Sequence, residues 1–551
     1  MSTAISVIGG VGLFLLGMTV MTDGLKALAG SALRAVLSKA AATPLRGSFW
    51  GALVTLLVQS SSATTMTTIA LVSAGLLTFS QGLGLIFGAN VGTTGTGWLV
   101  ALIGVRVSLT AAALPMNFVG ALIKLLASGR VSGAGAALAG FGLVLFGLTT
   151  LQQGMGGLAD RLHPADLPAV LDAGWWRGML GALVLVVVGL VMTAVMQSST
   201  AAIAVTLSAQ YAGAVGLDQG CALIIGQNIG TATSSALAAI GASTTAKRLA
   251  IAYVLFKMIA AVIALALFPV VTPLLVRASK AIDGVTLLAA YHTAYNVVGV
   301  VVLLPLIDRF TRLVERLLPE RGSPLTRCLD PSALATPIVA VEAVRRTIAR
   351  ALAAVCGPVE AALLAETRTE PVPAISVHEA VDALRQARVF LSDVAGPPDT
   401  DDEQRRLTST LHALDHASRL AETVAGIDFG TMRGGGDDVR AGQLCADAMR
   451  IVTSLANEVA VRPGIDRSER ASPARSGAKV LSTEEALVQL ERCATEMERL
   501  QRTHRGATLS AVASGTLTAD AAIVRVDTLR SLQALAWHAW RSTAHLVGRD
   551  K

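Results

Sequence analysis

A run of polar residues interrupts one of the most apolar regions of the sequence, from Gln59 to Thr65 (Gln-Ser-Ser-Ser-Ala-Thr-Thr). A second run, from Gln197 to Thr200 (Gln-Ser-Ser-Thr), repeats its beginning. These side chains are neutral hydrogen-bond donors and acceptors, so they suit the binding of an anion or a hard cation rather than proton transfer. The two runs predict one binding site built from two similar halves.

An asparagine motif follows each polar run at the same distance. Asn90-Val91-Gly92-Thr93 follows the first run and Asn228-Ile229-Gly230-Thr231 follows the second. The step from Gln to Asn is 31 residues in both copies (90 − 59 and 228 − 197). Because chance seldom reproduces two motifs at one spacing, the chain is expected to contain an internal repeat.

Composition favours a membrane protein. Hydrophobic residues make up 53% of the 551 and charged residues only 15%, and 20 of the 83 charged residues precede Asp308. The chain therefore has an apolar part and a polar part that join near residue 308. Neither part has a basic patch interleaved with aromatic residues, so we expect no nucleic-acid partner.

The apolar part contains runs long enough to cross a bilayer as helices, which takes about 20 residues each. They lie at roughly 4–22, 82–104, 110–128, 133–151, 219–241, 249–270 and 284–306. The two polar runs interrupt two longer apolar regions, 49–78 and 180–216, and each region is expected to form two short helices folded back as a re-entrant hairpin. Since an unpaired backbone amide is costly in hydrocarbon, each interruption should line a cavity.

The number of crossings predicts an inverted repeat. Three spans separate the two hairpins, and an odd number gives the second hairpin the opposite orientation. The order span, hairpin, span, span then occurs twice before a last span, which is the plan of many secondary transporters. The expected fold is therefore all-α: a polytopic membrane protein with two inverted-topology repeats, each containing a re-entrant hairpin, followed by a soluble helical bundle.

Charge predicts the orientation. Placing the 23–47 loop in the cytoplasm puts seven basic residues inside and five outside, as the positive-inside rule favours. The polar part then lies in the cytoplasm, which agrees with four of the five cysteines lying there without a CxxC pair. The N-terminal apolar run is expected to be a retained span rather than a signal peptide.

The polar part has the three-four apolar spacing of amphipathic helices. Six are predicted, at 336–367, 376–395, 402–425, 438–462, 482–504 and 519–547. Breaks are expected at Gly396-Pro397-Pro398, at Gly434-Gly435-Gly436 and from Arg462 to Gly477. The predicted domains are a transporter domain at 1–308 (repeats at about 4–128 and 133–270, extra span 284–306), a linker at 309–335 and a bundle at 336–551.

Broken helices add their own chemistry to the two polar runs. The N-terminus of a half-helix presents free amides that suit an oxyanion, and unwound carbonyls suit a monovalent cation such as Na⁺. A proton-coupled carrier usually has a carboxylate at mid-membrane depth. The acids before Asp308 all lie in predicted loops or at helix ends, so Na⁺ is expected as the coupling ion, with no other cofactor.

The paired motifs resemble those of the type II sodium-phosphate cotransporter family. The match is carried by Gln59-Ser-Ser-Ser-Ala-Thr-Thr with Gly88-Ala89-Asn90-Val91-Gly92-Thr93-Thr94, and by Gln197-Ser-Ser-Thr with Gly226-Gln227-Asn228-Ile229-Gly230-Thr231. In the bacterial branch a C-terminal domain similar to the phosphate-uptake regulator PhoU is common, and the segment from Leu411 to Leu420 resembles its helices. The resemblance implies sodium-coupled transport of inorganic phosphate by alternating access.

The resemblance also implies which residues bind. The substrate and sodium sites would be formed by Gln59, Ser60, Ser61, Ser62, Thr64, Thr65, Asn90, Thr93, Thr94, Gln197, Ser198, Ser199, Thr200, Asn228 and Thr231. A His-x-x-Phe-Asn-like element of the family is matched by His292-Thr-Ala-Tyr295-Asn296, whereas Tyr253-Val-Leu-Phe256-Lys257 departs from it and the first repeat keeps only Asn117. Lys257, His292, Asn296 and Asn117 are therefore further candidates.

Two other functions stay open at this point. One is phosphate export by a member of the same family. The other is a membrane-anchored PhoU-like regulatory protein without transport, acting through a cytoplasmic partner. An enzyme is not expected, because the chain has no P-loop, nucleophile elbow or HExxH motif. We assign no metal site, and homo-oligomer formation is left open.

Overall fold

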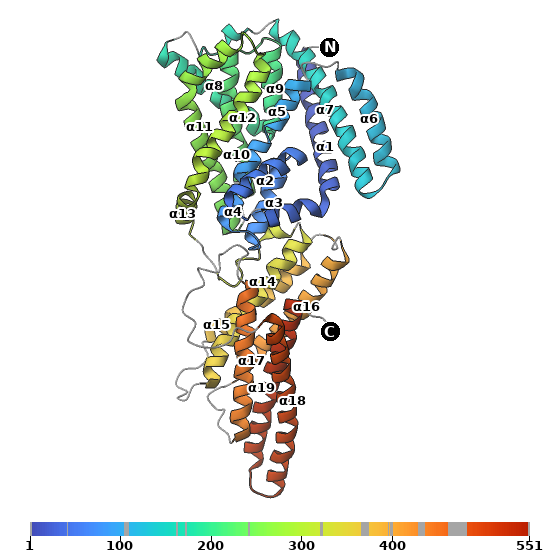
Figure 1. Cartoon of the computed structure of the whole chain (residues 1–551), viewed down its shortest axis with the longest axis vertical. Helices are drawn as coiled ribbons and strands as arrows, with labels where there is room; N and C mark the ends of the chain where they lie inside the picture. The colour runs from blue at the N-terminus through green and yellow to red at the C-terminus, as the bar shows by residue number, and fades with distance from the viewer. Residues whose placement is uncertain are drawn as a thin grey trace. The chain divides into compact units, whose positions relative to one another are not determined.

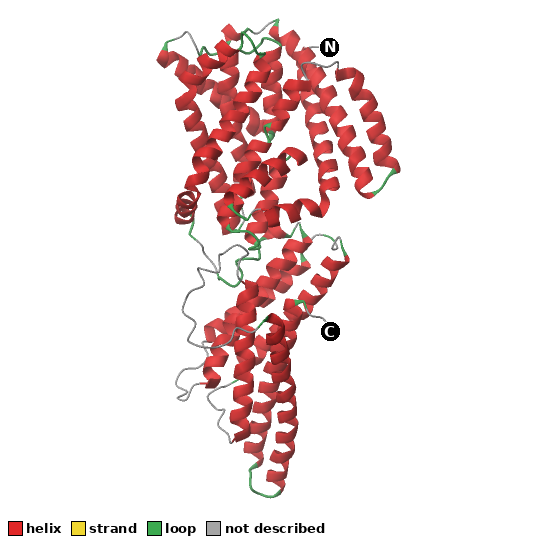
Figure 2. Ribbon diagram, viewed as in Figure 1, coloured by secondary structure: helices red, strands yellow, loops and turns green. Residues whose placement is uncertain are grey.

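The computed structural model describes all of the chain except residues 1–2, 41, 104–108, 161–162, 171–173, 241–242, 320–322, 335, 365–373, 395, 397–399, 428–435, 461–481 and 549–551. Helices dominate, and the described residues contain no strand (Figure 2). The chain divides into two compact units, Met1–Val72 with Leu77–Glu320, and Ser73–Leu76 with Arg321–Lys551. The prediction of an all-α fold is confirmed.

The first unit contains thirteen α-helices among its described residues (Figure 1). They are α1 (Thr3–Ala40), α2 (Pro44–Val58), α3 (Ser61–Ser73), α4 (Phe79–Gly92), α5 (Gly95–Ile103), α6 (Leu109–Leu126), α7 (Gly129–Ala159), α8 (Trp175–Met196), α9 (Ser199–Tyr211), α10 (Leu217–Ala238), α11 (Thr244–Ala278), α12 (Gly284–Leu303) and α13 (Ile307–Leu317).

Several of these helices are long and apolar enough to cross a membrane. Within the described residues six segments qualify: Thr3–Ala29, Phe79–Leu102, Gly129–Ala159, Trp176–Met196, Thr244–Ala278 and, in the second unit, Pro337–Leu364. Helices α10 and α12 coincide with two further predicted spans but are not among the six. The first unit is therefore that of a membrane protein with several spans.

Both predicted helix interruptions are present. The 49–78 region forms α2 and α3, which are separated at Gln59 and Ser60, and the 180–216 region forms α8 and α9, which are separated at Gln197 and Ser198. Each pair is a short helix after a sharp break, as the polar runs predict.

Three boundaries differ from the prediction. Helix α1 continues to Ala40 through the predicted 23–47 loop, because that segment is rich in Ala and Leu, which favour helix. The predicted 82–104 span is broken into α4 and α5, where the hydroxyls of Thr93 and Thr94 bond back to carbonyls of the preceding turn. Helix α13 occupies the start of the predicted 309–335 linker.

The first helices of the two predicted repeats, α1 and α7, pack against each other through glycines. A Cβ on each of three α1 glycines would lie within 2.5 Å of an α7 backbone nitrogen: Gly10 meets Leu151, Gly17 meets Val144 and Gly24 meets Ala137. Each step of seven residues along α1 moves the contact back by seven along α7. The two helices are therefore antiparallel, as equivalent helices of an inverted repeat must be.

The glycine before each asparagine motif also allows a close approach of backbones. A Cβ on Gly88 of α4 would lie 1.8 Å from the carbonyl oxygen of Ser48 on α2, and a Cβ on Gly226 of α10 would lie 1.8 Å from that of Val186 on α8. The second contact lies 138 positions after the first (186 − 48 and 226 − 88). The same packing thus holds α4 against α2 and α10 against α8.

We predict that Gly88→Ala and Gly226→Ala each destabilise the protein. The added methyl would collide with backbone rather than with a flexible side chain, and overpacking of this kind typically costs about 1–3 kcal/mol. Thermal unfolding of the purified protein in detergent measures the change. Gly12→Ala is the matched control, because a Cβ there meets open space; equal stability of all three variants would contradict the contact.

The second unit is a helical bundle. Its helices are α14 (Pro337–Leu364), α15 (Ala374–Ser392), α16 (Asp401–Gly426), α17 (Gly436–Ala460), α18 (Thr483–Ala513) and α19 (Ala519–Val547). All six match predicted helices, although α18 continues beyond its expected end at 504. The predicted breaks at 397–398, 434–435 and 462–477 lie outside the described residues.

Four histidines gather between α16 and α19. The Nδ1 atoms of His416 and His538 lie 3.0 Å apart, and the rings of His412 and His545 stack with centroids 5.0 Å apart. Burial, with the neighbouring His538 and Arg541, lowers the pKa of His416 to about 4. Burial also lowers the pKa of His538. The lowered pKa values of His416 and His538 fit their contact, because a bond between two Nδ1 atoms needs one of them as an unprotonated acceptor.

We predict that stability falls when the solution is acidified. The pKa of His416 is about 4 in the folded protein against an ordinary 6.5, so the unfolded chain binds more protons between these values. The stabilisation is complete above pH 6.5 and is lost as pH falls towards about 4. His416→Gln should reduce this dependence in thermal unfolding measured at several pH values, whereas an unchanged pH profile would show that the cluster does not control it.

Candidate functional site

At both helix breaks, a glutamine in the left-handed backbone conformation ends the first helix. Gln59 has φ 56° and ψ 30° at the end of α2, and Gln197 has φ 50° and ψ 22° at the end of α8. Of the residues that the structure describes, these are the only non-glycine residues with positive φ. The conformation costs an L-residue about 1–2 kcal/mol, and such strain is often found at functional sites.

The two glutamine side chains make matching hydrogen bonds. Each Nε2 donates to a carbonyl three residues earlier, in Leu56 and Ala194. Each Oε1 accepts from a hydroxyl 37 residues later: Thr96 Oγ1 at 2.6 Å from Gln59, and Ser234 Oγ at 2.9 Å from Gln197. Thr96 and Ser234 were not predicted, although their equal spacing from Gln (96 − 59 and 234 − 197) is a signal that the sequence contains.

The serine after each glutamine begins the next helix. Ser60 Oγ accepts from the amide of Ala63, and Ser198 Oγ accepts from the amide of Ala201, both at 3.2 Å. Ser61 and Ser62 thus lie in the first turn of α3, and Ser199 and Thr200 lie in the first turn of α9. First-turn amides have no partner within their own helix. The N-termini of α3 and α9 therefore each present hydrogen-bond donors and a partial positive charge.

The next polar residues differ between the repeats. In the first, Thr55 donates from α2 to Thr64 on α3 across 2.9 Å, and Thr64 and Thr65 are buried. The counterparts 138 positions later are Thr193 and Ala202. The buried Thr193 Oγ1 has no hydrogen-bond partner, because alanine replaces the second hydroxyl. The first hairpin is therefore tied internally, whereas the second leaves a hydroxyl available.

The asparagine of each repeat is buried and oriented by its own helix. Asn90 Nδ2 donates to Ile86 O at 2.8 Å, and Asn228 Nδ2 donates to Ile224 O at 3.0 Å. The Thr231 hydroxyl donates to Asn228 O, as that of Thr93 does to Asn90 O. These bonds fix the amide nitrogens and leave the side-chain oxygens to face other groups.

Helices α11 and α12 supply those groups in the second repeat. Asn228 Oδ1 accepts from Lys257 Nζ at 3.2 Å and from Asn296 Nδ2 at 3.3 Å. Tyr253 donates from its hydroxyl to Thr231 Oγ1 at 3.2 Å. Three of the further candidates are thus brought near the asparagine motif, since His292 lies one turn before Asn296 and its backbone oxygen accepts from Asn296.

Asn117 lies elsewhere. It is on α6, and its Oδ1 would be 2.6 Å from a Cβ on Gly142 of α7. Asn117 therefore packs against α7 rather than against the asparagine motif.

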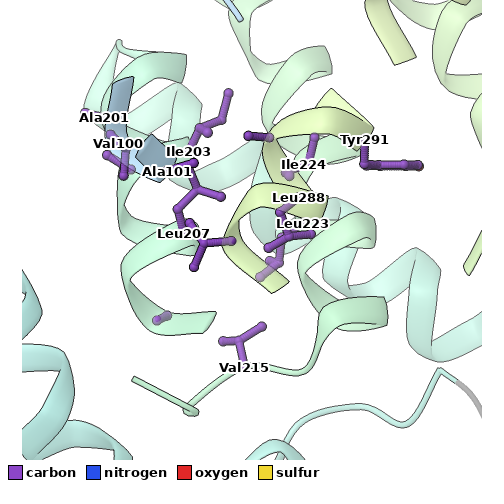
Figure 3. Close-up of a cluster of buried hydrophobic side chains, with 14 of the residues drawn as sticks. Val100, Ala101, Ala201, Ile203, Leu207, Val215, Leu223, Ile224, Leu288 and Tyr291 are labelled. Atoms are coloured by element: carbon purple, nitrogen blue, oxygen red, sulfur yellow. The ribbon is translucent and has the colours of Figure 1, made fainter. Parts of the chain in front are cut away.

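Besides α1 and α7, helices α5 and α9 bring the two repeats into contact. Val100 and Ala101 of α5 lie beside Ala201 and Ile203 of α9 in one apolar cluster (Figure 3). Ala201 follows Ser199 by two positions in the sequence. Within the described residues no hydrogen bond joins the Gln59–Thr65 run directly to the Gln197–Thr200 run; each run bonds within its own repeat. No group of three or more His, Cys, Asp or Glu residues in the described chain could hold a metal ion.

A family comparison decides the class of protein. Residues 13–153 and 179–288 match the Na⁺/Pi-cotransporter family. The first unit of this chain is therefore similar to the members of that family. Both matched segments contain one Gln-Ser break and its asparagine motif, so the family covers both half-sites.

Two of the following three relatives carry transport names. It is 29% identical over 310 residues to "Uncharacterized protein YqeW" of Bacillus subtilis, covering 56% of this chain and 96% of that one. It is 29% identical over 355 residues to "Putative inorganic phosphate export protein YjbB" of Escherichia coli, covering 63% of each. It is 48% identical over 61 residues to "Sodium-dependent phosphate transport protein 2A" of Oryctolagus cuniculus, covering 11% of this chain and 10% of that one.

No solved structure matches the chain. The chain spans less than two thirds of the E. coli relative and a tenth of the rabbit one. The matched family and the E. coli and rabbit relatives are named as transporters, which confirms the prediction that the chain is not an enzyme.

We predict that glycine is better tolerated than alanine at both breaks. Glycine adopts positive φ without steric cost, whereas alanine keeps the strain, and either change removes the glutamine amide. Gln59→Gly and Gln197→Gly should therefore be more stable than Gln59→Ala and Gln197→Ala by about 1 kcal/mol. Thermal unfolding of the four variants measures the difference, and greater stability of the alanine variants would mean that these residues are not left-handed.

Proposed function

We propose that this chain carries inorganic phosphate across a membrane together with Na⁺, by alternating access. The observation that carries the proposal is the matched pair of breaks: a left-handed glutamine, a capping serine and a hydroxyl 37 residues later, in both halves of a family-matched unit. The names of the E. coli and rabbit relatives support phosphate as the substrate, and the family name supports Na⁺.

The chemistry of the two breaks fits an oxyanion. Free amides at the starts of α3 and α9, with the hydroxyls of Ser61 and Ser199, present donors and partial positive charge without a full charge of their own. The carbonyls at the ends of α2 and α8, with the amide oxygens of Asn90 and Asn228, are neutral oxygens of the kind that binds Na⁺. One broken element thus offers ligands for both solutes.

The location of the carboxylates favours Na⁺ over protons. Asp160, Asp166, Asp218 and Asp283 lie at or beside helix ends, and Asp23 pairs with Lys26 at 3.2 Å on an exposed face of α1. None of these described carboxylates lies within the helices beside the breaks, where a proton-coupled carrier usually has one.

Export of phosphate is the second candidate, and the name of the E. coli relative favours it. Direction follows from the gradients and from the orientation of the protein, and the same site serves both directions. Comparing phosphate retention in whole cells with and without overexpression of the chain separates them, because an importer raises internal phosphate and an exporter lowers it.

We propose that the second unit is a regulatory bundle on the cytoplasmic side of the membrane. The excess of basic residues in loops on the same side supports this placement. A PhoU-like bundle there would contact a soluble regulatory partner. Flux that persists after deletion of residues 321–551 would assign this unit to regulation rather than to transport.

We predict sodium-dependent phosphate flux by purified protein in vesicles. Radiolabelled phosphate should move in response to an imposed Na⁺ gradient, and Ser61→Ala and Ser199→Ala should each abolish the movement, since each removes a first-turn hydroxyl. Ser279→Ala is the control, because Ser279 is exposed at the end of α11. Absence of flux with either gradient direction, from correctly folded protein, would refute the proposal.

A further inference from the structure

A lysine side chain is buried in the membrane unit beside the second asparagine motif. Lys257 is only 2% exposed. Its Nζ donates to Asn228 Oδ1 at 3.2 Å and lies 5.6 Å from the centroid of the Tyr253 ring. Both partners are neutral, so neither balances the charge of an ammonium.

No carboxylate lies within ion-pair distance of Lys257 among the residues that the structure describes. Charged side chains within a membrane are costly, and they are usually paired with an opposite charge or serve a transport pathway. A bound anion is the partner that would stabilise an ammonium at this position.

The surroundings of Lys257 are polar and incompletely bonded. Asn296 Oδ1, His292 Nδ1 and the Tyr295 hydroxyl are all buried without hydrogen-bond partners, on the helix that bonds Asn228. His292 Nδ1 faces α5 of the first repeat, 3.7 Å from where a Cβ on Gly97 would lie. Buried polar atoms without partners are unusual, and several in one cluster indicate a site that a solute completes.

Hydrogen bonds connect this cluster to the second helix break. Lys257 contacts Asn228, Tyr253 bonds Thr231 three residues later, and Ser234 three residues further on bonds Gln197. One segment of α10 thus carries the lysine contact and the glutamine contact. The ammonium belongs to the same half-site as the start of α9.

The first repeat has no such charge. Asn90 corresponds to Asn228, and the residue 138 positions before Lys257 is Val119, which is apolar. The protein therefore places a buried amine beside one half-site only.

We infer that Lys257 is a charge-compensating residue of the oxyanion site, and that its ammonium takes the role of one Na⁺ in the second repeat. The ammonium carries the same charge as Na⁺ and is held by a neutral amide oxygen, which is the type of ligand that Na⁺ uses. Binding of the oxyanion then needs one Na⁺ fewer than it needs with a neutral residue at 257. This inference rests on the proposed function.

The test compares Na⁺ dependence in the wild type, Lys257→Asn and Lys257→Arg. Binding of radiolabelled phosphate to purified protein is measured over a range of Na⁺ at constant ionic strength, and flux is measured in vesicles. Lys257→Asn should weaken phosphate binding at low Na⁺ by about tenfold or more, and should raise the Hill coefficient for Na⁺ by about one. Lys257→Arg should keep the wild-type Hill coefficient because it keeps the charge. Lys124→Asn, a change at an exposed lysine in the last turn of α6, should match the wild type.

If Lys257→Asn binds phosphate with the affinity and the Na⁺ dependence of the wild type, the inference is overturned. Sodium-dependent phosphate flux by the wild type would still support the proposed function. If Lys257→Asn does not fold, Lys257→Arg provides the test. A folded Lys257→Arg whose Hill coefficient for Na⁺ rises by about one would also overturn the inference, because this variant keeps the charge. Sulfate binding that depends on Lys257, without phosphate binding or flux, would retain the charge-compensating role and reject the proposed substrate. A wild-type protein that binds neither anion rejects both.

Discussion

The fold of the first unit depends on one constraint: backbone amides and carbonyls at a helix break must find partners where lipid supplies none. This chain meets the constraint twice in the same way. A glutamine takes the left-handed conformation, bonds back to its own helix and accepts from a hydroxyl of a later segment, and a serine caps the next helix. The first-turn amides of α3 and α9 keep no partner within their own helix. They are therefore the backbone groups at each break that can bind a solute.

Glycines determine how close the supporting helices come. Gly88 and Gly226 allow the backbones of α4 and α10 to contact those of α2 and α8. The α1–α7 pair uses the same device in antiparallel form. Inside a bilayer, helix association has no hydrophobic driving force and depends on close van der Waals packing, which these small residues allow.

Much of the fold was predictable from the sequence, because apolar length, three-four spacing and the Gln-Ser interruptions are local signals. The bundle helices and both breaks lie where they were expected. The division of α4 from α5 was missed, because it depends on threonine hydroxyls that bond to the backbone, and the same residue type also occurs inside unbroken helices. The paired motifs identified the two half-sites, but the positions of Lys257 and Asn117 depend on tertiary packing: one meets Asn228, and the other meets α7.

The break between α4 and α5 has a consequence for energetics. Its counterpart, α10, continues without interruption from Leu217 to Ala238. In the proposed carrier, two identical inverted halves would give the states open to either side equal free energy. Here the first half is interrupted at Thr93 and Thr94 where the second is a continuous helix, so the two halves differ in backbone. For the proposed mechanism, the two states of the empty carrier therefore need not be equally populated, even before any solute or gradient acts.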